Sequence, residues 1–293
     1  MTALRSYTVL VIAALVVGAV VVPSLAGTPA SPDRVVVVEV DERITDDTAL
    51  QVTRQLRSLR DDDSVAAVVL RVSSPGGSAA ASEAMYLSVR RLAAEKPVVT
   101  SVGGLAMSGA YYTAVGSDEI LVTPASLVGH VGVIAFAPSG GLSPSATTGP
   151  DKASGGLTRD QFFTRLESIK RAFVGAVMTE RGEELTVSRS VVGEASAFSG
   201  SKAVENGYAD GIGGVEAAIA AAADRAEVSD YRVQYTDPAQ PARGLSLGSN
   251  TTVAATGPGE YRGVDTVRYL MLYGVPEADG QAYNATAAAE VGA

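Results

Sequence analysis

The chain has 293 residues, 46% of them hydrophobic, which is enough for one or two globular domains with a buried core. A net charge of −9 argues against nucleic acid as a partner. Cysteine is absent, which excludes disulfides and thiolate chemistry, and His130 is the single histidine.

Residues 1–30 are interpreted as an export segment outside the folded domain. Arg5 precedes an uncharged run, Ser6 to Pro32, whose apolar centre is Val9 to Val22. A membrane span needs about 20 apolar residues, whereas Ser24-Leu25-Ala26 also fits a signal-peptidase site. We favour an uncleaved anchor over a cleaved signal peptide. Both interpretations export the rest of the chain, and Arg5 favours a cytoplasmic N-terminus.

Alternating strands and helices predict an α/β domain with a largely parallel sheet over residues 34–235. β-Branched runs indicate strands, and apolar residues at helical spacing indicate helices. Ser82 is the expected N-cap of the second helix. The predicted strands are Arg34–Val40, Val65–Val72, Val98–Val102, Glu119–Val122, Val131–Ala135 and Tyr231–Tyr235. The predicted helices are Asp46–Arg60, Ser82–Ala94, Thr158–Arg181, Lys202–Asn206 and Val215–Ala226.

Two stretches have the composition of loops. Pro138 to Gly156 is rich in Gly, Pro, Ser and Thr and contains Lys152. Long loops of this kind are often functional. Residues 236–293 form an extension of similar composition with one apolar island, Val267 to Val275, for which we expect a single docked strand. Asn250 and Asn284 begin N-glycosylation patterns, which are common by chance.

A candidate nucleophile stands at a strand-to-helix turn. The stretch Val98 to Tyr112 leaves a strand at Gly103-Gly104, reaches Ser108 and enters a run of small and aromatic residues. A serine there can expose its hydroxyl beside the backbone N–H groups of a helix N-terminus. The alternative is a serine that merely caps a buried helix, and Ser108 taken alone favours that alternative.

A second strand ends in a turn suited to an oxyanion. The strand from Val65 runs into Ser74-Pro75-Gly76-Gly77-Ser78, where no side chains cover the N–H groups of the glycines. Strands of a parallel sheet present their carboxyl ends at one edge, where α/β proteins bind ligands. The two strand ends can therefore lie side by side and form one site.

A serine nucleophile needs a base, and the residues alone leave the choice open. Lys152 can serve if burial lowers its pKa towards neutrality. His130 can serve in a Ser-His-Asp triad, and a carboxylate is a weaker base for this step. His130 stands at the mouth of a predicted strand, where a structural histidine is the commoner case. The sequence has no cluster of metal ligands.

From about residue 35 to residue 233, the chain resembles the signal peptide peptidase A family of membrane-anchored serine peptidases. No single motif is specific for this family, but the order and spacing of the motifs together are specific for it. The matching stretches are Ser74–Ser78, Gly103–Tyr112, Val128–Ile134, Phe173-Val174 with Arg181-Gly182, Ala197–Gly200 with Ala203, and Gly207–Asp210 with Ile212–Gly214.

The resemblance implies a ClpP/crotonase-like α/β domain with an N-terminal membrane anchor. It also implies a catalytic dyad of Ser108 and Lys152, oxyanion donors at the N–H groups of Gly76 and Gly109, and no metal or cofactor. The family usually has a serine in place of His130, and that serine helps to position the lysine. His130 therefore either takes over this positioning or acts as the base itself.

The implied activity is that of a serine endopeptidase that cleaves remnant signal peptides or other hydrophobic segments. It would be a single-pass protein of the cell membrane with its catalytic domain outside the cytoplasm. Single-domain relatives draw the lysine from a neighbouring subunit, which implies a ring-like homo-oligomer. One competing interpretation is a ClpP-like membrane protease that trims membrane partner proteins.

Two more interpretations belong to different functional classes. An inactive scaffold relative has little reason to retain Ser108, Lys152 and both glycine turns together. A crotonase-type acyl-CoA enzyme would share the fold and the oxyanion chemistry, but the export segment argues against a cytoplasmic substrate.

Overall fold

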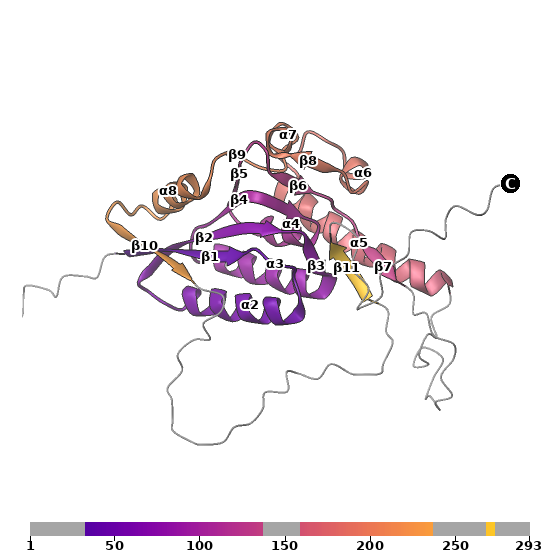
Figure 1. Cartoon of the computed structure of the whole chain (residues 1–293), viewed down its shortest axis with the longest axis horizontal. Coiled ribbons are helices and arrows are strands. Elements are labelled where there is room, and N and C mark those ends of the chain that lie inside the picture. Colours follow the sequence, from indigo (N-terminus) through magenta and orange to yellow (C-terminus); the bar gives the residue numbers. More distant parts are fainter. Residues whose placement is uncertain (1–32, 137–158, 237–267, 273–293) are drawn as a thin grey trace, which may run out of the picture.

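The computed structural model describes residues 33–136, 159–236 and 268–272 (Figure 1). Its main sheet comprises β1 (Asp33–Val40), β2 (Val65–Ser74), β4 (Val98–Met107), β5 (Glu119–Val122), β6 (Leu127–Gly129), β8 (Ala197–Ser199), β9 (Gly211–Ile212) and β10 (Tyr231–Thr236). The strand order is β10-β1-β2-β4-β5-β9, and all pairs along it are parallel. β6 pairs parallel with β4, and β8 pairs antiparallel with β6. The expected α/β domain with a largely parallel sheet is confirmed.

A second, smaller sheet joins three segments that lie far apart in the sequence. It consists of β3 (Gly76–Ser78), β7 (Ile134–Phe136) and β11 (Arg268–Leu272). β11 lies between the other two strands and is antiparallel to both. The described part of the apolar island, Arg268–Leu272, therefore does form a docked strand, as expected.

Helices cover both faces of the main sheet (Figure 1). On one face lie α2 (Asp46–Arg60), α3 (Ala79–Ala93), α4 (Gly109–Ala114) and α5 (Arg159–Arg181), and on the other lies α8 (Val215–Arg225). The short helices α6 (Arg189–Val192) and α7 (Gly200–Glu205) follow α5 in the chain.

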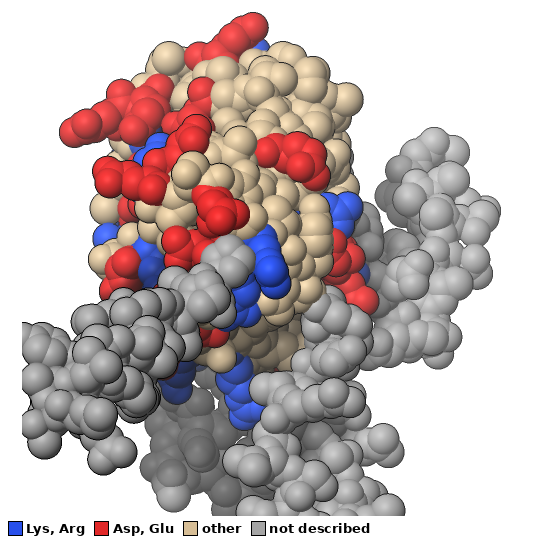
Figure 2. Space-filling view, turned by 90° about the vertical axis from the view of Figure 1, so that its left-hand side faces the viewer, with Lys and Arg blue, Asp and Glu red and all other residues tan. Residues whose placement is uncertain are grey.

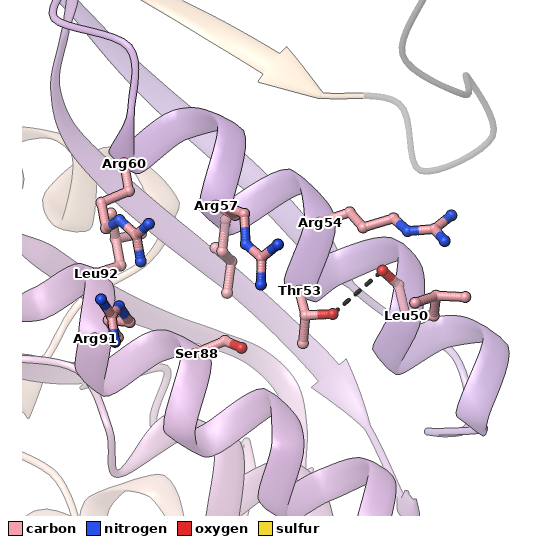
Figure 3. A pocket seen from close by; sticks show the side chains of 9 residues that line it. Leu50, Thr53, Arg54, Arg57, Arg60, Ser88, Arg91 and Leu92 are labelled. Carbon is pink, nitrogen blue, oxygen red and sulfur yellow. Dashed lines mark hydrogen bonds between the residues drawn. The ribbon is translucent and has the colours of Figure 1, made fainter.

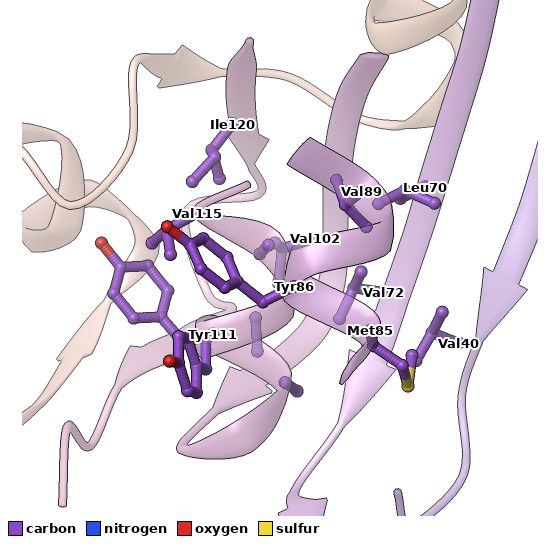
Figure 4. Close-up of a cluster of buried hydrophobic side chains, with 14 of the residues drawn as sticks. Val40, Leu70, Val72, Met85, Tyr86, Val89, Val102, Tyr111, Val115 and Ile120 are labelled. Carbon is purple, nitrogen blue, oxygen red and sulfur yellow. The ribbon is translucent and has the colours of Figure 1, made fainter. Parts of the chain in front are cut away.

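The valines of β1 show how the sequence builds two cores. Successive side chains of a strand point to opposite faces of the sheet. Val36 and Val38 therefore belong to the core under α2 and α3, whereas Val35 and Val37 belong to the core under α8. Figure 4 shows the larger core, in which side chains of α3 meet those of the β-strands. Strands buried on both faces explain the continuous β-branched runs of the sequence.

Helix α2 begins and ends where its sequence pattern predicts. Thr45 caps it, because its Oγ1 accepts the N–H of Thr48 at 3.1 Å. The expected cap of α3 was wrong: Ser78 accepts the N–H of Ala81 at 3.4 Å, and the Ser82 hydroxyl donates to the Ser78 carbonyl at 2.8 Å. The helix starts early because β3 ends directly at its first turn.

Three other expected boundaries are corrected by long-range contacts. β4 does not stop at Val102 but continues through both glycines to Met107, because β6 pairs with its second half. The expected strand Val131–Ala135 is replaced by β6 and β7 on either side of His130. α7 begins at Gly200 rather than Lys202. A Cβ on Gly200 would lie 1.9 Å from the Thr123 carbonyl oxygen, so only glycine fits this contact.

Several predictions fall on residues outside the described ranges. These are the export segment, the loop that carries Lys152, and both glycosylation patterns. Within the described residues, no helix combines the length and the apolar character that crossing a membrane requires.

The surface reflects the acidic composition of the chain. Figure 2 shows acidic side chains gathered over the upper part of one face, with fewer basic side chains among and below them. Exposed ion pairs such as Arg225–Glu119, at 2.9 Å, contribute at most about 1 kcal/mol each.

Candidate active site

Ser108 occupies the turn between β4 and α4 in a backbone conformation that residues other than glycine rarely adopt. Its φ is 55° and its ψ is −120°. The turn is fixed on both sides, because the Ser108 N–H donates to the Gly129 carbonyl at 2.7 Å and the Tyr112 N–H donates to the Ser108 carbonyl at 2.9 Å. Such backbone strain costs about 1–3 kcal/mol and persists where the surroundings impose it, often at functional sites.

The Ser108 hydroxyl is buried and has no hydrogen-bond partner within the described ranges. The residue is 1% exposed. The interpretation of Ser108 as a helix cap is wrong, because its side chain makes no capping bond to α4. Leaving a buried hydroxyl without a hydrogen bond costs about 1–3 kcal/mol, so the Ser108 hydroxyl lowers the stability of the fold.

Strand register brings Gly76 and Ser108 to the ends of two adjacent strands. Ser74 of β2 pairs with Ala106 of β4, and each candidate site residue lies two positions beyond this pair. Gly76 has a φ of 89°, which glycine tolerates well. Its N–H donates to the Ser74 hydroxyl at 3.2 Å, and that hydroxyl donates to the Glu42 carbonyl at 2.6 Å. To bind the Gly76 N–H, an oxyanion would have to displace the Ser74 hydroxyl as its hydrogen-bond acceptor.

Gly109 is the first residue of α4 and is buried. The first N–H groups of a helix have no acceptor within that helix, so they remain available to an anion. The Gly109 carbonyl accepts the Thr113 hydroxyl at 3.1 Å, which holds this turn of the helix. Gly76, which begins β3, and Gly109, which begins α4, thus follow the ends of the adjacent strands β2 and β4.

His130 follows β6 directly, one residue after the glycine that binds the Ser108 backbone. Its φ is 57°, and its N–H donates to the Ser196 carbonyl at 2.8 Å. Burial lowers the pKa of His130 below its ordinary value, which favours the neutral ring at neutral pH. The Ser108 hydroxyl makes no hydrogen bond to this ring, so the described residues do not form a Ser-His pair.

Lys152 lies outside the described residues, so its position relative to Ser108 stays a prediction. Of the five candidate site residues, the structure places Ser108, Gly76, Gly109 and His130 around the ends of three adjacent strands, β2, β4 and β6.

Aromatic packing holds α4, the helix that follows the Ser108 turn. Tyr112 of α4 stacks on Phe173 of α5, with ring centroids 4.6 Å apart, and meets Tyr86 of α3 at 4.9 Å. The Tyr86 hydroxyl donates to Glu180 at 2.5 Å. Burial, together with this carboxylate, raises the pKa of Tyr86 to about 12, so the phenol remains a donor. Figure 4 shows Tyr86 and Tyr111 within this core.

A partly buried ion pair, formed by the buried Arg181 and the more exposed Asp210, anchors the C-terminal end of α5, and sequence reasoning missed its role. Arg181 donates to both oxygens of Asp210 at 2.8 and 2.9 Å, and also to the Gly207 carbonyl at 3.0 and 3.1 Å. Asp210 in turn accepts the N–H of Ile120 of β5 at 2.7 Å. The available signal was an arginine in the last turn of an otherwise apolar helix face.

One pocket lies apart from these residues, between α2 and α3 (Figure 3). Its lining includes Arg54, Arg57, Arg60 and Arg91, and Thr53 donates to the Leu50 carbonyl at 3.2 Å beside it. None of the candidate site residues lines it. In the described ranges, no three His, Asp or Glu side chains lie close enough to hold a metal ion.

Comparison with known proteins identifies the relatives of the chain. Residues 90–139, which include Ser108, match the model of peptidase family S49. Protease 4 of Salmonella typhi is 30% identical over 196 residues, which cover 62% of this chain and 32% of the relative. A putative signal peptide peptidase SppA of Enterococcus faecium is 28% identical over 195 residues, which cover 61% of this chain and 56% of the relative.

The chain thus spans about a third of Protease 4 and just over half of the Enterococcus protein. Among solved structures, an alanine mutant of the 1510-N membrane-bound stomatin-specific protease matches with a TM-score of 0.49 and 15% identity, covering 71% of this chain and 99% of the other. The family model over the Ser108 turn and the SppA-type relatives agree, and over these stretches the chain is similar to the SppA-type serine peptidases of family S49.

Proposed function

We propose that this chain is a serine endopeptidase in which Ser108 is the nucleophile. The observation that carries the proposal is the Ser108 hydroxyl, which is buried, held in a strained turn and without a partner among the described residues. A capping serine would bond to α4, and Ser108 does not. The family match over the same turn supports this interpretation.

The proposed reaction proceeds through an acyl-enzyme. The Ser108 Oγ attacks the scissile carbonyl carbon while the neutral Lys152 amine takes the hydroxyl proton and passes it to the leaving amine. The N–H groups of Gly76 and Gly109 bind the oxyanion. Water then attacks the acyl carbon while Lys152 takes its proton; the bond from this carbon to the Ser108 Oγ breaks, Lys152 returns the proton to Oγ, and the carboxylic acid product leaves.

Lys152 is the proposed base because the family resemblance assigns that role to its position. A lysine works near neutral pH only if burial depresses its pKa, which contact with a neighbouring subunit would provide. We therefore propose a ring-like homo-oligomer in a ClpP/crotonase-like fold. His130 is proposed to position the lysine, since its ring is not hydrogen-bonded to Ser108.

The proposed location is the outer side of the cell membrane, with residues 1–30 as a single-pass anchor. The uncharged run from Ser6 to Pro32 supports this. The proposed substrates are remnant signal peptides or other hydrophobic segments near the membrane, as the family resemblance implies.

Labelling with a serine-reactive fluorophosphonate tests the nucleophile. The wild-type chain should be labelled at Ser108, and Ser108→Ala should lose both labelling and peptide hydrolysis. Ser101→Ala is the matched control, because Ser101 is a buried serine of the same strand, and it should keep both. Full labelling and hydrolysis in the Ser108 variant would refute the assignment.

The base is tested by substitution and by subunit mixing. Lys152→Ala and Lys152→Arg should both be inactive, because arginine stays protonated. Lys170→Ala, a lysine of α5, should remain active, and His130→Ala should keep part of the activity. Mixing Ser108→Ala subunits with Lys152→Ala subunits should restore some activity if the dyad spans two chains. An active Lys152→Ala with an inactive His130→Ala would replace the dyad with a histidine mechanism.

A further inference from the structure

The small sheet brings a remote segment of the chain to the candidate active site. β11 comes from the C-terminal extension, yet it lies between β3 and β7 and also contacts α3 and α4 (Figure 1, yellow arrow). β3 begins at Gly76, the candidate oxyanion donor, and α4 begins directly after Ser108. β11 therefore runs across the site rather than along a remote edge of the fold.

The register shows which end of β11 reaches the site. Arg268 pairs with Phe136, and Leu272 pairs with Gly76. The strand thus enters alongside β7 and ends opposite the residue whose N–H would hold the oxyanion. A peptide bound in this way would present the carbonyl of its last paired residue to Ser108.

The backbone groups on one side of β3 bond to Ile44, and those on its other side face β11. The Ile44 N–H donates to the Gly76 carbonyl at 2.9 Å, and the Ser78 N–H donates to the Ile44 carbonyl at 2.8 Å. Because backbone groups of a strand alternate in direction, the N–H and carbonyl of Gly77 point the other way, towards its partner Met271.

The position of Gly77 is itself fixed by close packing. A Cβ on Gly77 would lie 1.9 Å from the Ile44 carbonyl oxygen, so β3 is pressed against Ile44 and cannot turn its free side elsewhere. Without β11, the facing edges of β3 and β7 would carry unpaired backbone groups. Two such edges, separated by the width of one strand, form a slot for an extended peptide.

The residues of β11 suit the proposed substrate class. Val267 to Val275 reads VRYLMLYGV and is the one apolar island in an extension otherwise rich in small and polar residues. A hydrophobic segment of the chain itself thus lies where a hydrophobic peptide substrate would bind.

We infer that β11 is an internal substrate mimic that occupies the peptide-binding slot between β3 and β7 and competes with substrates for it. Peptide substrates take its place as an antiparallel strand, with the residue before the scissile bond in the position of Leu272. The inhibitory part of this inference rests on Ser108 acting as proposed above. The occupation of the slot does not.

The first experiment measures occupation without any catalysis. In a Ser108→Ala background, the amide of Gly77 should be protected from hydrogen exchange by β11. Met271→Pro removes the N–H that faces Gly77 and should accelerate exchange of this amide by at least about tenfold. Ala254→Pro, in the same extension, is the control and should leave it unchanged. The amide of Val69 in β2 should stay protected in all variants, which shows that the domain remains folded. Unchanged Gly77 exchange in Met271→Pro would overturn the inference.

The second experiment measures competition in chains with Ser108 intact. Met271→Pro should be labelled by a fluorophosphonate, and should hydrolyse a peptide substrate, several-fold faster than the wild type or Ala254→Pro. A synthetic peptide of residues 267–275 should reverse this gain. Equal rates in all three chains, despite faster Gly77 exchange, would overturn the inhibitory role. If no chain has activity, the proposed function fails, and the exchange experiment alone decides whether β11 fills the slot.

Discussion

Replacing Ser108 with glycine should stabilise the fold, whereas replacing it with alanine should not give the same gain. The backbone of Ser108 is at φ 55° and ψ −120°, a region that glycine enters freely and other residues do not. Both variants remove the unpartnered hydroxyl, so the difference between them isolates the backbone strain. Relief of about 1–3 kcal/mol, less about 0.5–1 kcal/mol for the greater flexibility of glycine in the unfolded chain, leaves a net gain of about 1 kcal/mol.

Thermal unfolding followed by circular dichroism measures this difference. For a domain of this size, 1 kcal/mol corresponds to a Tm difference of about 2–4 °C. Ser101 is the matched control, since it is a buried serine of β4 paired with Arg71 and Leu121 in the regular part of the strand. There the order should reverse, with Ser101→Gly less stable than Ser101→Ala by about 0.5–1 kcal/mol. A Ser108→Gly chain no more stable than Ser108→Ala would show that the turn stores no strain.

Three further predictions concern the surroundings of the site. In a urea titration, Arg181→Met should cost about 1–3 kcal/mol in unfolding free energy, because it leaves the buried Gly207 carbonyl without its donor. Arg225→Met, at an exposed pair, should cost at most about 1 kcal/mol, and equally small losses in both variants would contradict the anchoring role of Arg181. Gly77→Ala should abolish peptide hydrolysis and lower the Tm, because its Cβ would collide with the Ile44 carbonyl, and a fully active variant would show that β3 can shift. Burial lowers the pKa of His130 in the folded chain, so as the pH falls His130 is protonated in the unfolded chain before it is protonated in the folded one, and the fold loses stability. The fall in stability from pH 7 to pH 5 should therefore be less steep in His130→Asn than in the wild type. Equal slopes would argue against burial as the cause.

The sequence by itself determined most of the elements and pointed to Ser108 as the candidate nucleophile. Periodicity and β-branched runs are local properties, so the bounds of α2 and β5 follow from their own residues. The apolar island of the extension likewise predicts β11. The family resemblance over the Ser108 turn is carried by the motif alone and agrees with the family model.

Only the tertiary structure decided how these parts meet. The continuation of β4 through Gly103-Gly104 depends on β6, which supplies partners for backbone groups that the local sequence would leave unpaired. The early start of α3, the strain at Ser108 and the pairing of β11 with β3 likewise arise from contacts between residues distant in the chain. Local patterns specify which way each segment prefers to fold, but a hydrogen-bond partner or a close packing contact exists only once the sheet has brought its strands together.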